Sequence, residues 1–298
     1  MLQIPNLQQN IKIAPYTTYE IGGPADYFVV VKNKDELINA VTQARENKIP
    51  YFILGIGANI LFGDKGFRGL VVKNEANKIS IFDNLITAES GATISDLIEI
   101  TTEQNLSGFE HFAGIPSTVG GALWQNLHFL SPDRTETVYI DSILASAEIL
   151  DESNNLQKVA KDFFEFGYDT SILHKKDLIV TEATFKLEFK EKTTIQKQIA
   201  ENLKWRADRQ PALEKFPSCG SVFKKIKSVG AGRLIDQAGL KGYRVGDAQV
   251  SEKHANFIIN TGNATAKDVR DLIKLIQEKV LKETGHKLET EISFVGEF

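Results

Sequence analysis

Apolar residues recur with the period of a helix in several stretches of the chain. The clearest stretch covers residues 265–285, and its apolar stripe consists of Val269, Leu272, Ile273, Ile276 and Val280. Thr265 and Asp268 have the spacing of an N-terminal capping pair, and Gly285 is the residue type that commonly ends a helix. The pattern therefore predicts a long amphipathic helix near the C-terminus.

Three other stretches are shorter or more polar but also read as helices. Asn33 with Glu36, and Thr93 with Asp96, are capping pairs that precede periodic apolar residues. Residues 190–209 are charged and periodic, which predicts a helix that leads to a last domain.

Short runs of β-branched and aromatic residues between the helices predict strands. These runs are residues 27–31, 49–54, 69–72, 86–89, 143–150, 178–189 and 289–295. Alternation within 143–150 and 178–189 favours antiparallel pairing. Because the strands are short and mixed irregularly with helices, the order favours an α+β fold over a doubly wound parallel sheet.

Two glycine-rich stretches interrupt the pattern. Residues 113–122 follow a helix end expected near Gly108, and their composition can aim successive N–H groups into one concavity that suits a diphosphate. An ordinary tight loop is the alternative. Residues 54–59 form a second such stretch, and two loops of this kind can hold one dinucleotide from both sides. Gly55 and Gly57 do not make a Rossmann fingerprint, because the third glycine and the helix that should follow are missing.

Composition excludes several classes of protein. The 298 residues carry a formal net charge of −4, so no general basic field attracts nucleic acid or an anionic membrane. No apolar run approaches the roughly 20 residues of a membrane span, no signal peptide is visible, and Cys219 is the single cysteine. We therefore expect a cytoplasmic, multi-domain protein with no nucleic-acid partner, no membrane insertion and no obligate protein partner.

Few polar residues stand out as candidate chemistry by themselves. Ser221 follows Gly220 before an apolar strand, but without a nearby histidine a turn serine is the simpler interpretation. Glu291 alternates with apolar neighbours, so it is either the exposed side of a strand or a carboxylate in a cleft. Arg206 and Arg209 can bind phosphate or lie on the solvated face of a helix. The five histidines have no metal-ligand spacing, so we expect no metal.

Taken together, several motifs resemble the UDP-N-acetylenolpyruvylglucosamine reductase family, also called UDP-N-acetylmuramate dehydrogenases. The motifs lie at residues 16–25, 55–59, 114–121, 218–224, 238–244, 249–257 and 288–291. They follow one another in the family's order, so the resemblance covers nearly the whole chain.

The resemblance implies a fold of the vanillyl-alcohol-oxidase type, in which two α+β subdomains hold FAD and a C-terminal α+β domain binds the substrate. We accordingly expect FAD-binding subdomains over residues 1–74 and 75–190 and a substrate domain over 191–298. The reaction that it implies uses NADPH to reduce FAD, which then delivers hydride to UDP-N-acetylglucosamine enolpyruvate. The product would be UDP-N-acetylmuramate, a peptidoglycan precursor.

The same motifs carry the family's functional residues onto this chain. Ser221 is implied as the proton donor and Glu291 as the carboxylate that stabilises the enol-like intermediate. FAD contacts are implied for Gly55, Ile56, Gly57, Ala58, Asn59, Ile60, Gly114, Ile115, Pro116, Ser117, Thr118, Gly120, Gly121, Asn126 and Arg206. Substrate contacts are implied for Arg209, Lys224, Lys253, His254 and Asn256.

Asp169 departs from the family pattern, in which an arginine follows a Gly-Tyr pair. Its carboxylate reverses the charge that should meet the substrate, and like charges at about 4 Å and an effective dielectric near 20 repel by roughly 4 kcal/mol. A neighbouring cation can compensate, and Arg134 is one candidate. Residues 127–131 also depart, because bulky side chains replace a small, glycine-containing stretch, and Asp247 replaces a common glycine.

Two alternatives to the reductase remain open at this point. One is a flavin oxidoreductase of the same fold with a different acceptor, which Asp169 favours. The other is a non-catalytic flavin- or nucleotide-binding homologue, and the presence of both Ser221 and Glu291 argues against it. The sequence also leaves open whether the protein prefers NADPH or NADH and whether Cys219 is reactive.

Overall fold

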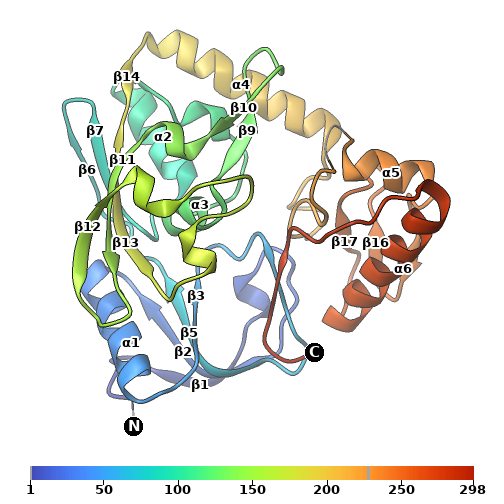
Figure 1. Ribbon diagram of the computed structural model, residues 1–298, viewed down its shortest axis with the longest axis horizontal. Helices are drawn as coiled ribbons and strands as arrows, with labels where there is room; N and C mark the ends of the chain where they lie inside the picture. The colour runs from blue at the N-terminus through green and yellow to red at the C-terminus, as the bar shows by residue number, and fades with distance from the viewer. Residues whose placement is uncertain (1, 227–228) are drawn as a thin grey trace. The chain divides into compact units, whose positions relative to one another are not determined.

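The computed structural model describes residues 2–226 and 229–298, which divide into two compact units (Figure 1). Unit 1 consists of Met1–Asn6, Val29–Gly55 and Val72–Arg206, and unit 2 of Leu7–Phe28, Ile56–Val71 and Ala207–Phe298. The three-part division into 1–74, 75–190 and 191–298 stays a prediction.

Unit 1 mixes helices with antiparallel strands. Its helices are α1 (Lys34–Glu46), α2 (Ile94–Glu103), α3 (Val119–Gln125) and α4 (Lys192–Arg209), with short 3-10 helices η2 (Glu110–Phe112), η3 (Ile140–Ser142), η4 (Lys161–Phe164) and η5 (Ile172–His174). The end of α4, residues 207–209, belongs to unit 2. Its strands are β3 (Tyr51–Leu54), β6 (Ile79–Phe82), β7 (Leu85–Glu89), β8 (Leu106–Ser107), β9 (His128–Leu130), β10 (Thr137–Tyr139), β11 (Leu144–Leu150), β12 (Leu156–Ala160), β13 (Ile179–Lys186) and β14 (Glu188–Phe189).

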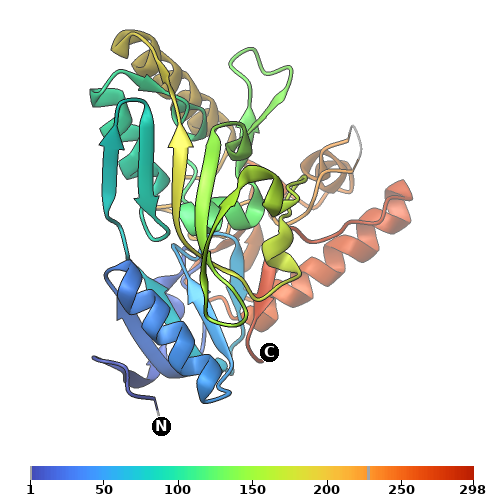
Figure 2. The same cartoon turned by 60° about the vertical axis from the view of Figure 1, so that its left-hand side comes forward.

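A five-stranded sheet is the centre of unit 1, and Figure 2 shows its strands side by side. The strand order is β12-β11-β13-β7-β6, and every pair is antiparallel. The antiparallel pairing predicted for residues 143–150 and 178–189 is therefore confirmed as β11 with β13. Two-stranded sheets β9–β10 and β8–β14 complete the unit, and β3 follows β5 (Phe67–Asn74) in a further sheet.

The core of unit 1 forms where α2 and α3 meet the sheet. Phe109 packs edge-on against Phe185 of β13, with ring centroids 5.0 Å apart. Leu97 of α2, Leu123 of α3 and Phe185 all belong to one buried apolar cluster. This burial stabilises α3, whose seven residues are too few to be stable as an isolated helix.

Unit 2 combines strands with the helices α5 and α6. Its elements are β1 (Gln8–Lys12), η1 (Ala14–Tyr16), β2 (Pro24–Val31), β4 (Ile60–Phe62), β5, α5 (Ala231–Gln237), β15 (Arg244–Val245), β16 (Ala248–Val250), β17 (Ile258–Asn260), α6 (Ala266–Thr284) and β18 (Ser293–Val295). β1, β2 and β5 follow one another in one sheet, and the ends of β2 and β5 belong to unit 1. β15, β16 and β17 form a meander, and β18 pairs in parallel with β4.

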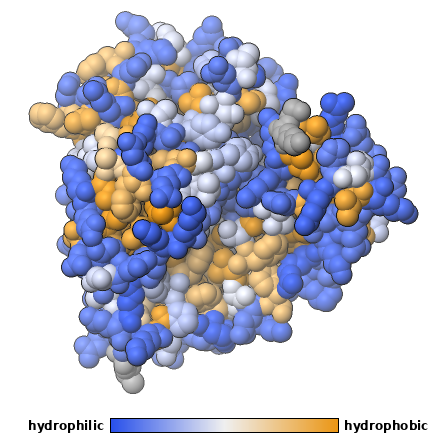
Figure 3. Space-filling model, viewed as in Figure 1, coloured by the Kyte–Doolittle hydropathy of each residue, from blue (hydrophilic) through white to orange (hydrophobic). Residues whose placement is uncertain are grey.

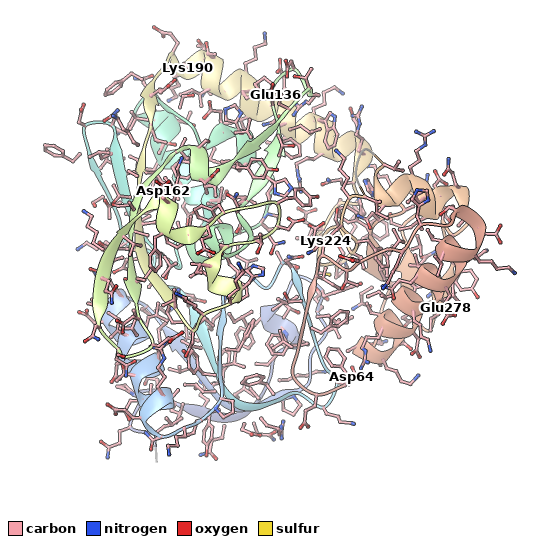
Figure 4. All side chains as sticks on the ribbon, viewed as in Figure 1. Asp64, Glu136, Asp162, Lys190, Lys224 and Glu278 are labelled. Atoms are coloured by element: carbon pink, nitrogen blue, oxygen red, sulfur yellow. The ribbon has the colours of Figure 1, made fainter. Side chains whose placement is uncertain are left out.

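α6 has the caps and the apolar stripe that the sequence predicts. Thr265 accepts a hydrogen bond from the N–H of Asp268 at 3.0 Å, and Asp268 accepts one from the N–H of Thr265 at 3.0 Å. The carboxylate of Asp64, labelled in Figure 4, accepts from the N–H groups of Ala266 and Lys267 at 2.8 and 2.9 Å. The predicted stripe of five apolar residues is buried in the core of unit 2.

Several elements differ from the sequence prediction. The stretch 113–122 is predicted as a loop, but α3 begins at Val119, because Thr118 caps it by accepting from the N–H of Gly121 at 3.3 Å. α2 ends at Glu103 instead of near Gly108, and the strand predicted over 289–295 is only β18.

In the described part of the chain, no helix is both long and apolar enough to cross a membrane. Hydrophilic residues cover most of the face in Figure 3. The same residues contain no group of three or more His, Cys, Asp or Glu side chains that could hold a metal ion.

Candidate active site

The two glycine-rich stretches approach each other in unit 1 at Gly55. A Cβ atom at this position would lie 2.7 Å from the hydroxyl oxygen of Thr118, so only glycine allows this approach. Lys73 Nζ donates to the carbonyl of Gly55 at 2.5 Å, and burial lowers the pKa of Lys73. The structure thus places the start of the first predicted FAD loop beside the second.

The second loop, residues 114–121, uses many of its N–H groups internally. The N–H groups of Ile115, Val119 and Gly120 donate to backbone carbonyls at 2.8–3.0 Å, and that of Gly121 donates to Thr118. The expectation that successive N–H groups of this loop form one anion cradle is therefore wrong for these four. Ile115 and Gly121 donate to the nearby residues Phe112 and Thr118, whereas Val119 and Gly120 donate to the carbonyls of Ala92 and Ser90, so all four are already satisfied.

The first loop behaves in the opposite way. Its carbonyl groups are used: Gly57 accepts from Thr18, and Asn59 accepts from the N–H of Ser293 at 3.0 Å. The N–H groups of residues 56–59 donate to none of the residues that the structure describes. Unused backbone donors in a glycine loop fit the oxygen atoms of a diphosphate.

Arg206, near the end of α4, is a half-buried cation beside the second loop. A side chain at Gly114 would come within 3.1 Å of Arg206, and the guanidinium lies 5.7 Å from the ring centroid of Phe129. Burial lowers the pKa of Arg206 to about 10. A desolvated cation favours an anionic partner, so this residue also fits the diphosphate of FAD.

Backbone pairing in unit 2 brings the segments of the two predicted catalytic residues together. Ser221 forms a bridge with Phe257, and Phe223 forms one with Thr290 on the other side of the same segment. The N–H of Glu291 donates to the carbonyl of Val222 at 2.8 Å. Glu291 therefore lies directly beside the residue that follows Ser221.

Asn256, which the resemblance implies as a substrate contact, holds this segment in place. Its Nδ2 donates to the carbonyl of Phe223 at 2.8 Å, and its Oδ1 accepts from the N–H of Phe223 at 3.0 Å. Its own carbonyl accepts from the N–H of Val222 at 2.9 Å. The buried amide is thus a backbone clamp for the strand that carries Ser221.

Cys219 is packed into the core of unit 2 with 2% of its surface exposed. Burial raises the pKa of the Cys219 thiol well above its usual range, and the charge of Glu291 raises it further. The sequence leaves the reactivity of this residue open, and the structure makes it a small core residue beside Glu291.

The remaining predicted substrate residues differ in their surroundings. His254 Nδ1 accepts from the N–H of Asn256 at 3.2 Å, and burial lowers the pKa of His254, so the ring is neutral with its proton on Nε2. Lys253 Nζ donates to the carbonyl of Ala207. Lys224, labelled in Figure 4, is fixed by the bond from its N–H to Glu289 at 2.9 Å. Arg209 is the last residue of α4.

Asp169, the charge-reversed position, is buried in unit 1 with 2% of its surface exposed. His128 lies beside it, with Nδ1 3.8 Å from Oδ1 of Asp169. Arg134, the cation suggested from the sequence, instead lies over the rings of Phe129 and Trp205, at 5.5 and 5.7 Å from their centroids. His128 was not a candidate residue, although it lies in the other stretch that departs from the family pattern.

Comparison with known proteins connects both units to one family. Residues 210–295 match the family model described as UDP-N-acetylenolpyruvoylglucosamine reductase, C-terminal domain, and residues 25–158 match an FAD binding domain. The reductase of Clostridium perfringens (strain SM101 / Type A) is 40% identical over 279 residues, which are 93% of this chain and 89% of the relative. The reductase of Caldanaerobacter subterraneus is 41% identical over 298 residues, which are 100% of this chain and 96% of the relative.

A solved structure gives the same result. The crystal structure of UDP-N-acetylenolpyruvylglucosamine reductase from Thermus caldophilus has a TM-score of 0.79 and 32% identity, and the match covers 96% of this chain and 97% of that one. The α+β, FAD-binding fold predicted from the sequence is thus confirmed. The chain belongs to the UDP-N-acetylenolpyruvoylglucosamine reductase family.

Proposed function

We propose that this protein is an FAD- and NADPH-dependent oxidoreductase that reduces UDP-N-acetylglucosamine enolpyruvate to UDP-N-acetylmuramate. The observation that carries the proposal is the pairing that sets Glu291 beside the Ser221 segment, in a chain of this family with an FAD-binding domain. A nucleotide sugar is accordingly the substrate class. We place the protein in the cytoplasm, where NADPH and nucleotide sugars are available.

By the family resemblance, FAD contacts are assigned in each unit separately: to residues 56–59 of the first glycine loop in unit 2, and to Thr118 and Arg206 in unit 1. Unused N–H groups and a desolvated guanidinium are the donors that a diphosphate requires. When bound there, FAD supplies the carrier that passes hydride from NADPH to the substrate double bond.

Ser221 and Glu291 are assigned to the substrate half of the reaction. Addition of hydride to one alkene carbon leaves an electron pair on the neighbouring carbon, which the adjacent carboxylate stabilises as an enolate. Ser221 Oγ–H gives that carbon its proton and takes one back from solvent, while Glu291 stabilises the enol-like form. Asn256 keeps the Ser221 strand in register for this transfer.

An anaerobic experiment in two steps tests this assignment. NADPH should bleach the flavin absorbance, and UDP-N-acetylglucosamine enolpyruvate should then restore it. Ser221→Ala should keep the bleaching rate and slow the restoration by about a hundredfold or more, because general-acid catalysis is lost. Ser153→Ala, in an exposed turn, serves as the matched control.

Other outcomes of the same experiment would contradict the proposal. If Ser221→Ala slowed bleaching and restoration equally, Ser221 would not be the proton donor of the substrate half-reaction. Bleaching without restoration in the wild-type protein would favour a flavin oxidoreductase with a different acceptor, the alternative that Asp169 suggests. A protein that cannot be loaded with FAD would overturn the assignment altogether.

A further inference from the structure

The five-stranded sheet of unit 1 ends in the hairpin of β7 and β6, and β6 is its edge strand (Figure 2). No other strand of the described residues pairs with the outer side of β6. Phe82, at the end of this strand, is 81% exposed, and Ile81 and Leu85 are each 36% exposed. An open edge with exposed apolar side chains is a surface on which another strand can pair.

The hydrogen bonds between β6 and β7 show which backbone groups face outward. The N–H of Glu89 donates to the carbonyl of Lys78 at 2.9 Å, so these opposite residues form a hydrogen-bonded pair. Such pairs alternate along antiparallel strands, so the next ones join residue 80 with 87 and residue 82 with 85. The N–H and C=O groups of Ile79 and Ile81 therefore point away from β7, and they bind no residue that the structure describes.

The side chains of β6 present a different surface on each face of the sheet. Ile79 and Ile81 lie opposite Ala88 and Ile86, which are buried in the core of unit 1. Both isoleucines therefore extend the core face to the edge of the sheet. Phe82 lies on the other face because successive side chains alternate.

The charges at the two ends of β6 have opposite signs. Lys78 precedes the strand, Asp83 follows it, and both are exposed. Such a strand is complementary to an antiparallel copy of itself. If Ile79 of one copy pairs with Ile81 of the other, Lys78 lies opposite Phe82 of the second copy and one residue from its Asp83. The lysine stem then covers the ring while the ammonium reaches the carboxylate.

Like charges stay apart in the same register. The two copies of Lys78 are separated by four residues, or about 14 Å, along the strands. This distance exceeds the Debye length of about 8 Å at physiological ionic strength, so their repulsion is largely screened.

We propose that the β6 edge is the interface of a homodimer, in which the β6 strands of two copies pair antiparallel about a two-fold axis. The two symmetric pairs of Ile79 with Ile81 supply the backbone hydrogen bonds, and their side chains continue the apolar face across the axis. Lys78 and Asp83 set the register. Each copy uses its β6 edge once, so association stops at two.

The opposite edge of the sheet offers a different surface. There β12 is flanked by η4, which packs against it. Its exposed residues 156–158 include the polar Gln157 and the charged Lys158, which disfavour pairing at an edge.

Sedimentation velocity of the FAD-loaded protein at about 1 to 100 µM tests the dimer, because its population rises with concentration. The wild-type protein should shift from the mass of one chain toward twice that mass. Ile81→Lys places a charge on the core face of the edge and should raise the dissociation constant of the dimer at least about tenfold. Leu156→Lys is the matched control, since Leu156 is a 49% exposed apolar residue of the other edge strand. It should keep the wild-type dissociation constant.

An exchange of charges tests the register in variants that keep the apolar surface. Lys78→Glu brings like charges together twice in each dimer and should weaken it roughly fivefold to tenfold. Addition of Asp83→Lys restores opposite charges and should recover the dimer. Circular dichroism should be the same for all variants.

A wild-type protein that stays monomeric at about 100 µM would overturn the proposal. So would a dimer that both Ile81→Lys and Lys78→Glu leave intact, or one that Leu156→Lys dissociates. None of these results bears on the proposed reaction, whose residues lie outside β6.

Discussion

At the scale of single residues, the chain places its one thiol next to the proposed chemistry and keeps it inert. Cys219 is two residues before Ser221, and both its burial and the nearby Glu291 disfavour the thiolate. Because the thiolate is the nucleophile, position alone does not make this cysteine reactive. Its small side chain fits a core that a larger residue would disrupt.

We expect a disulfide reagent at about pH 8 to modify Cys219 in the folded protein about a hundredfold more slowly than in urea, since the thiolate fraction falls tenfold per unit of pKa. The released thiol chromophore measures both rates directly. Cys219→Ser should release none. Rapid modification of the folded, FAD-loaded protein would contradict the burial of this thiol.

The residues of the proposed site divide by the kind of signal that they leave in the sequence. Ser221 and Glu291 lie in motifs that follow the order of the family, so the resemblance alone identifies them as candidate residues. The clamp made by Asn256 and the contact between His128 and Asp169 depend on which backbone atoms pair, and sequence spacing does not encode such pairings. In the sequence, residues 127–131 and Asp169 only appear as two separate departures from the family pattern. The structure shows that His128 of the first contacts Asp169.

At the scale of elements, caps and apolar periodicity predicted the longer helices but not the short ones. α1, α2 and α6 begin at their predicted caps, Asn33, Thr93 and Thr265. α3 and α5 have seven residues each and contain glycine, so their stability comes from packing and not from propensity. Hydrophobic periods cannot reveal helices of this length.

The capping box of α6 provides a test of this reasoning. Thr265→Ala removes the hydroxyl that accepts from Asp268 and should lower the free energy of unfolding by about 1 kcal/mol. Urea unfolding followed by circular dichroism measures the change. Lys267→Ala, which removes only an exposed ion pair with Asp271, should change it by less than about 0.5 kcal/mol. Equal effects of the two variants would show that the cap contributes nothing specific.

At the scale of the whole molecule, the sequence predicted the fold class through motifs that extend over nearly its full length. It could not predict which donors remain unused after folding, because that depends on every local hydrogen bond. The N–H groups of residues 56–59 in the first loop have no described partner, while four N–H groups of the second loop donate to Phe112, Thr118, Ser90 and Ala92. The cofactor assignment therefore depends on Arg206 and the first loop more than the sequence suggested.

Binding of FAD should accordingly stabilise the whole protein, and Arg206 should control by how much. At a concentration 100 times its dissociation constant, FAD adds about 2.7 kcal/mol to the free energy of unfolding. Arg206→Gln loses charge-assisted hydrogen bonds and should weaken FAD binding roughly tenfold to a hundredfold, so the rise in Tm at the same FAD concentration should fall by about half or more. Without FAD the variant should be at least as stable as the wild type, because a desolvated cation is gone.

Thermal unfolding with and without FAD measures both effects, and flavin fluorescence gives the dissociation constant independently. Lys197→Gln, on the exposed side of the same helix, is the control and should keep the full rise in Tm. If Arg206→Gln also kept the full rise, Arg206 would not contact the cofactor. The desolvated guanidinium would then bind a different anion. The nucleotide sugar has a diphosphate of its own, so thermal unfolding of wild type and Arg206→Gln with and without that sugar would be the next measurement.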